Sequence, residues 1–116
     1  MNLKLNEWLQ RQGQHPRVLA GGVLYPDRNK FTQSFHPVWP AFAFEPLWQQ
    51  LQEAGPLLQA QGLRLNQSRW TFKNGWVYCR ARGDGAMLAL IVERAASAQD
   101  LAAVEQLLAE FELLAA

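Results

Sequence analysis

Cysteine and histidine are scarce in this sequence. The 116 residues include one cysteine, Cys79, and two histidines, His15 and His36. A lone cysteine excludes a disulfide within the chain and fits a reducing compartment. Neither histidine has a second His or Cys at the spacing of a metal site. We therefore expect no metal centre, and a cytoplasmic protein.

Long apolar runs and an excess of one charge are also missing. The N-terminal region contains no apolar stretch long enough for a signal peptide or a membrane span. The formal net charge is +1, which provides little long-range attraction for nucleic acid or for an acidic membrane. We expect neither of these as a partner.

The residue pairs that catalysis requires are absent as well. Several carboxylates are dispersed among predicted turns and element ends, where no second group is placed for acid–base work. They are Asp27, Glu45, Asp84 and Glu93. The glycine-rich turns lack the following helix of a phosphate-binding loop. The sequence thus predicts no catalytic residue, no cofactor and no enzyme.

Residues 69–92, in contrast, predict three strands joined by two tight turns. Asn74-Gly75 is typical of a two-residue hairpin turn with positive φ, and Gly83-Asp84-Gly85 provides a second flexible corner. With Asn74 and Gly75 at the centre of the first turn, the expected strand partners are Lys73–Trp76, Phe72–Val77, Thr71–Tyr78, Trp70–Cys79 and Arg69–Arg80.

This pairing separates the two faces of the hairpin, because successive side chains of a strand alternate between faces. The apolar face consists of Trp70, Phe72, Val77, Cys79 and Ala81, so Cys79 is expected to be buried and inert. The opposite face consists of Arg69, Thr71, Lys73, Trp76, Tyr78, Arg80 and Arg82. We expect the middle helix of the chain to cover part of this second face.

The third strand of this segment, residues 86–92, has no polar alternation, so both of its faces must be covered. This predicts a central strand in a sheet that has helices on both sides. The other patterns predict a helix after Asn2, strands at 18–25 and 30–36 with the second at an edge, a kinked helix from Pro46, and a last helix capped by Ser97 and Asp100. The expected α+β domain, residues 1–116, has the order α-β-β-α-β-β-β-α.

This pattern resembles the roadblock/dynein-light-chain superfamily, a profilin-like α/β/α fold. The most similar segments are residues 18–27 with the strand that follows them, and residues 62–94 with their two turns. The resemblance implies a five-stranded antiparallel sheet with the middle helix on one face and the two terminal helices on the other. The first hairpin departs from the family, which often has an Asp-Gly type turn where this chain has Asp27-Arg28-Asn29-Lys30.

The resemblance also implies a non-enzymatic protein that dimerises by pairing the edge strand of the meander and packing the middle helices together. Transferred to this chain, the dimer interface consists of Leu47, Trp48, Leu51, Leu58, Leu65, Arg69, Trp70, Thr71 and Phe72. Many members of the superfamily regulate small GTPases or motor complexes. We therefore expect a homodimeric scaffold or regulatory protein whose partner is another protein, such as a small GTPase.

Two other functions fit parts of the sequence. A secretion-chaperone-like module would hold an extended peptide along the sheet edge or in a helix groove. The basic and aromatic residues Trp76, Tyr78, Arg80 and Arg82 form a candidate partner surface and resemble a nucleic-acid platform. The balanced net charge and the expected packing of the arginine stems along the rings favour a protein partner.

Overall fold

The computed structural model describes residues 4–12, 17–35, 45–50, 53, 60–61, 67–72 and 75–114. Their elements are α1 (Lys4–Gln12), β1 (Val18–Leu24), β2 (Lys30–Ser34), β3 (Gln67–Phe72), β4 (Gly75–Ala81), β5 (Met87–Glu93) and α3 (Ala98–Leu113), and residues 45–50 are helical. The predicted α+β class is confirmed. Asn2, the expected N-cap of the first helix, lies outside the described residues.

The strands form one antiparallel sheet in the order β2-β1-β5-β4-β3. The apolar strand β5 lies at its centre, and its five inner residues are all buried. This confirms the predicted central position of that strand. The edges of the sheet are β2 and β3, so the predicted edge placement of the second strand is confirmed as well.

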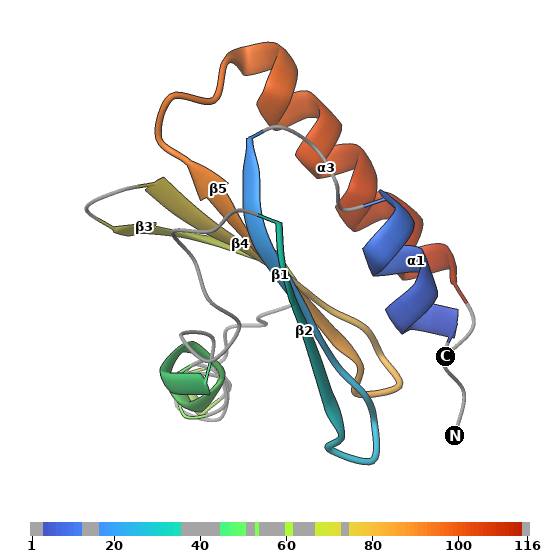
Figure 1. Ribbon diagram of the computed structural model, residues 1–116. Coiled ribbons are helices and arrows are strands. Elements are labelled where there is room, and N and C mark those ends of the chain that lie inside the picture. Colours follow the sequence, from blue (N-terminus) through green and yellow to red (C-terminus); the bar gives the residue numbers. More distant parts are fainter. Residues whose placement is uncertain are drawn as a thin grey trace.

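Helices lie on both sides of this sheet. Figure 1 shows α1 and α3 side by side on one face and the helical segment of residues 45–50 on the other. The first layer packs on a cluster that includes Leu5, Leu9, Tyr78, Leu88, Leu90, Val104, Leu108 and Phe111. The second packs on a cluster that includes Leu19, Leu24, Trp48, Val77, Cys79, Ala89 and Ile91. Because β5 has buried residues in both clusters, it stabilises both layers. Full burial of one large apolar side chain contributes about 1.5–3 kcal/mol.

The start of α3 is fixed by a capping box. The Ser97 hydroxyl accepts a hydrogen bond from the Asp100 backbone N–H at 3.2 Å, and the Asp100 carboxylate accepts one from the Ser97 backbone N–H at 2.9 Å. Two N–H groups that the helix itself leaves unpaired are thereby satisfied. The predicted cap is confirmed, and α3 has the buried stripe that its spacing indicates.

The register of β3 on β4 differs from the prediction. Phe72 pairs with Gly75, and Trp70 pairs with Val77 rather than with Cys79, so each β3 residue meets a β4 residue two positions earlier than expected. Gly75 is the first residue of β4 and has no positive φ. This register is not the one expected for a turn centred on the Asn-Gly pair, and Lys73 and Asn74 lie outside the described residues. Side chains alternate with a period of two, so the two-residue shift leaves the predicted faces unchanged.

A close backbone approach explains the glycine at position 75. A Cβ atom there would lie 2.0 Å from the Val92 carbonyl oxygen and 3.2 Å from the Arg94 backbone nitrogen. Any side chain would therefore force β4 away from the end of β5. The sequence signal at Gly75 was real, but close contact rather than positive φ requires the glycine.

Candidate interaction surfaces

The outer edge of β3 is the first candidate site. Arg82 N–H donates to the Ala86 carbonyl at 2.8 Å, which makes this pair a hydrogen-bonded pair of the β4–β5 ladder. Hydrogen-bonded and non-bonded positions alternate along antiparallel strands, so the even-numbered residues of β4 bond to β5 and the odd-numbered ones to β3. This alternation determines the direction of each backbone group on β3.

On β3, the residues that bond to β4 are Ser68, Trp70 and Phe72, because they face the odd-numbered residues of β4. The backbone N–H and C=O groups of Gln67, Arg69 and Thr71 therefore point outward, away from the sheet. Among the described strands, β4 is the only neighbour of β3. The Arg69 side chain is exposed. This edge presents a row of backbone groups that another strand can pair.

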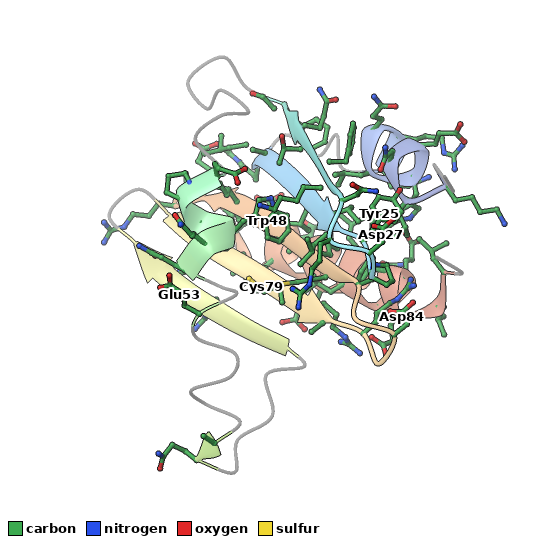
Figure 2. The ribbon with its side chains drawn as sticks, turned by 90° about the horizontal axis from the view of Figure 1, so that it is seen from below. Tyr25, Asp27, Trp48, Glu53, Cys79 and Asp84 are labelled. Carbon is green, nitrogen blue, oxygen red and sulfur yellow. The ribbon has the colours of Figure 1, made fainter. Side chains whose placement is uncertain are left out.

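The helical segment of residues 45–50 corrects one predicted interface residue. Trp48 is 0% exposed and belongs to the cluster with Val77 and Cys79, so it is a core residue of its own chain. Figure 2 shows Trp48 over the sheet near Cys79 and Glu53 at the outside. Leu47 packs partly against the same cluster. Leu51, Leu58 and Leu65, which were also predicted to lie in the interface, are outside the described residues.

The predicted partner surface around Tyr78 is also corrected. The structure places α3 over this face of the sheet, where the middle helix was expected. Tyr78 is 3% exposed, and Trp76 packs partly against the same cluster of α1 and α3. Arg80 Nε lies 3.2 Å from Glu112 Oε2 of α3. These residues hold the helix layer on the sheet, so they do not form an exposed platform for a partner.

Arg82, the fourth residue of that surface, closes the C-terminus of α3. Its Nη1 donates to the carbonyl of Phe111 at 3.1 Å and to that of Leu114, and its guanidinium carbon lies 4.9 Å from the Phe111 ring centre. α3 has no basic residue in its last turn. The Arg82 cation therefore supplies the charge that the carbonyl end of a helix favours.

Asp84 orients this arginine. Arg82 donates from Nε to Asp84 Oδ1 at 3.2 Å and from Nη2 to Asp84 Oδ2, and the same carboxylate accepts the Ala86 N–H at 3.0 Å. The hydrogen bonds from Arg82 are the main reason why the pKa of Asp84 is lowered from its ordinary value of 3.8. The second turn of the meander thereby fastens α3 to the sheet. The sequence reasoning missed this role of Arg82.

A comparable contact attaches α1 to the first hairpin. The Tyr25 hydroxyl donates to Asn6 Oδ1 at 2.6 Å and accepts the Asn6 backbone N–H at 3.2 Å. Burial is the main cause that raises the pKa of Tyr25 above its ordinary value. The interaction satisfies one of the N–H groups at the start of the helix.

Within the described part of the chain, no helix is long and apolar enough to cross a membrane.

The comparisons with known proteins establish the fold. No family model matches the sequence, and no curated protein matches it either. A Roadblock/LC7 domain from Streptomyces avermitilis superposes with a TM-score of 0.60 and 19% identity, covering 90% of this chain and 88% of that chain. The fold is that of a Roadblock/LC7 domain.

A second structure of the same fold agrees with this result. Myxococcus xanthus MglB superposes with a TM-score of 0.58 and 12% identity, over 93% of this chain and 91% of that chain. The predicted resemblance to the roadblock superfamily is confirmed at the level of the fold. The comparisons indicate no enzyme family.

Proposed function

We propose that this protein is a non-enzymatic scaffold or regulatory protein that acts as a homodimer joined through β3. The open row of backbone groups at Gln67, Arg69 and Thr71 is the observation that carries the proposal. An unpaired edge exposes N–H and C=O groups and invites another strand. A second copy satisfies both edges at once, because a two-fold interface uses the same patch on each chain.

The charge of Arg69 restricts how two copies pair. Only outward-facing residues of one β3 can bond to outward-facing residues of the other. A two-fold axis through Arg69 would place two guanidinium groups directly opposite each other, which is destabilising. We therefore favour a register in which Arg69 faces Gln67 or Thr71 of the second copy. The predicted interface residues Trp70 and Phe72 then belong to the paired strand, while their own backbone groups bond to β4.

The proposed test replaces Thr71 by proline. An outward-facing N–H takes no part in the β3–β4 ladder, so Thr71→Pro removes a donor from the open edge while leaving that ladder intact. The matched control is Thr32→Pro, at an outward position of the other edge strand. Light scattering should show a dimer for the wild type and for Thr32→Pro, and a monomer for Thr71→Pro. A wild type that stays monomeric at micromolar concentration contradicts the dimer.

The proposed partner is another folded protein, such as a small GTPase. The support is the likeness to a superfamily whose members commonly act in this way, together with a fold that offers an extended two-chain platform. Calorimetric titration against small GTPases loaded with GDP or with a non-hydrolysable GTP analogue tests the proposal. We expect binding that depends on the bound nucleotide, and absence of binding in both states contradicts this partner.

An extended peptide is the alternative occupant of the same β3 edge, as in a secretion-chaperone-like module. The Thr71→Pro variant would weaken both modes, so the oligomeric state separates them. A monomer that binds a disordered segment, and loses it on Thr71→Pro, supports the peptide-holding module. A dimer that binds a folded protein supports the scaffold.

A further inference from the structure

The sheet has a second edge, formed by β2, whose outward-facing groups also follow from the hydrogen bonds. Tyr25 N–H donates to the Asn29 carbonyl at 2.8 Å, and Phe35 N–H donates to the Leu19 carbonyl at 2.9 Å. The odd-numbered residues of β2 thus bond to β1. The backbone groups of Lys30, Thr32 and Ser34 point outward, in the same arrangement as on β3.

Side chains of the chain itself occupy both ends of this second edge. Gln33 Nε2 donates to the Ser34 carbonyl at 3.0 Å, and this carbonyl is one of the outward-facing acceptors. At the other end, Lys30 Nζ lies 2.9 Å from Glu45 Oε1, which holds a lysine and the start of the helical segment beside the first residue of β2. A lysine is a known means of protecting an edge strand, and the Gln33 amide occupies an acceptor that an added strand would need.

We propose that β2 is closed to strand addition by Gln33 and Lys30, so that growth of the sheet occurs only at β3. A chain with two open edges could add copies at each end and form an extended assembly. A chain with one open edge stops after one copy has been added. This inference deepens the proposed homodimer, because it explains why the assembly ends at two chains.

The test opens the β2 edge with the double variant Lys30→Thr/Gln33→Val. Threonine and valine favour strands, and the substitutions remove the lysine and the amide donor. We expect the mass from light scattering to rise to at least twice that of the wild type between micromolar and millimolar concentration. The control Gln10→Val makes the same replacement at an exposed position of α1, and should keep the wild-type mass. Circular dichroism verifies that each variant is folded.

The same substitutions in a Thr71→Pro background separate this inference from the proposed dimer. With β3 blocked, an opened β2 edge should convert a monomer into a dimer, even if the wild type proves not to dimerise through β3. A folded double variant with the mass of its parent at every concentration overturns the closure of β2.

A single variant covers the case in which the double variant does not fold. Gln33→Thr removes only the amide that occupies the Ser34 carbonyl, and it keeps a polar strand-forming residue. We expect it to increase the mass in the same direction. A folded Gln33→Thr variant with unchanged mass overturns the role of Gln33. A wild type that forms larger species, which Thr32→Pro disperses, overturns the closure altogether.

Discussion

Arg28 shows how a single residue can carry backbone strain in this fold. It has φ of 76°, in the left-handed region that favours glycine, and is the last of the three residues between the hydrogen-bonded pair Tyr25 and Asn29. Its N–H donates to the Tyr25 carbonyl at 2.9 Å, and Asp27 Oδ1 accepts the Asn29 N–H at 3.0 Å. These bonds define a three-residue hairpin loop whose last residue is normally glycine.

Replacement of this arginine by glycine should therefore stabilise the protein. We expect Arg28→Gly to raise the free energy of unfolding by about 0.5–1 kcal/mol, because glycine adopts this conformation without strain. Urea unfolding monitored by tryptophan fluorescence measures the change. Arg28→Ala keeps the Cβ atom and serves as the control. Equal stability of the two variants would show that the backbone conformation is not the cause.

The contact between Arg82 and Asp84 makes stability depend on pH. The pKa of Asp84 is lowered in the folded chain, so its ionised form stabilises the fold above its ordinary value of 3.8. This contribution is lost as the pH falls through the lowered pKa. The Asp84 side chain is 42% exposed, so solvent screening limits the contribution of its carboxylate to about 0.5–1 kcal/mol.

The variant Asp84→Asn should accordingly be less stable than the wild type at neutral pH and equally stable in acid. Urea unfolding at a series of pH values measures the difference between the two proteins. Glu105→Gln, at an exposed position of α3, is the control for loss of one negative charge. A difference for Asp84→Asn that stays constant down to strongly acidic pH contradicts the role of its ionised form.

Residue-scale prediction from the sequence succeeded where the cause was local. The capping box of Ser97 and Asp100 depends on residues three apart, and the sequence revealed it. The role of Arg82 depends on the end of α3, whose carbonyls at Phe111 and Leu114 lie 29 and 32 residues further along the chain. No local pattern specifies that contact, and this is why an arginine that fastens a helix was predicted to face a partner.

At the scale of elements, the strands of the meander are positioned by backbone contact as well as by turn residues. The register of β3 on β4 is not that of a turn centred on the Asn-Gly pair, and Gly75 lies against the last residues of β5. The sequence predicted that a hairpin exists and which residues share a face. The exact partners depended on the β4–β5 approach, which a turn motif does not contain.

Substitution of Gly75 tests this register. We expect Gly75→Ala to lower the free energy of unfolding by about 2–3 kcal/mol, since the new Cβ meets backbone atoms that cannot rotate away. Gly21→Ala is the matched control, because its Cβ would meet the ends of the Leu9 and Leu90 side chains, at 2.9 Å and 3.1 Å. Those ends can move, so the loss should be smaller, about 1 kcal/mol.

Asparagine at the same position distinguishes the two registers directly. It tolerates positive φ, so Gly75→Asn would be nearly neutral if Gly75 occupied a type I′ turn. In the observed register it should be as destabilising as alanine. Chemical unfolding of both variants decides between these outcomes, and a stable Gly75→Asn protein would support the register predicted from the turn residues.

At the scale of the whole molecule, the layers followed from one apolar strand. The absence of polar alternation in residues 86–92 required helices above and below the sheet, and the structure has them there (Figure 1). Which helix covers which face was not predictable, because both faces of β4 contain large apolar residues. Trp48 packs in the core on one face of the sheet, and Tyr78 packs on the opposite face, which α3 covers. The corrections to Trp48 and Tyr78 do not change the position of β3 at the edge of the sheet.

The most direct test of the account is amide hydrogen exchange along β3 at high and low protein concentration. The amides of Ser68, Trp70 and Phe72 should be protected at both, because they bond to β4. Those of Arg69 and Thr71 should be protected only at high concentration, where a second copy pairs the outer edge. Rapid exchange of Arg69 and Thr71 at every concentration would contradict pairing through β3.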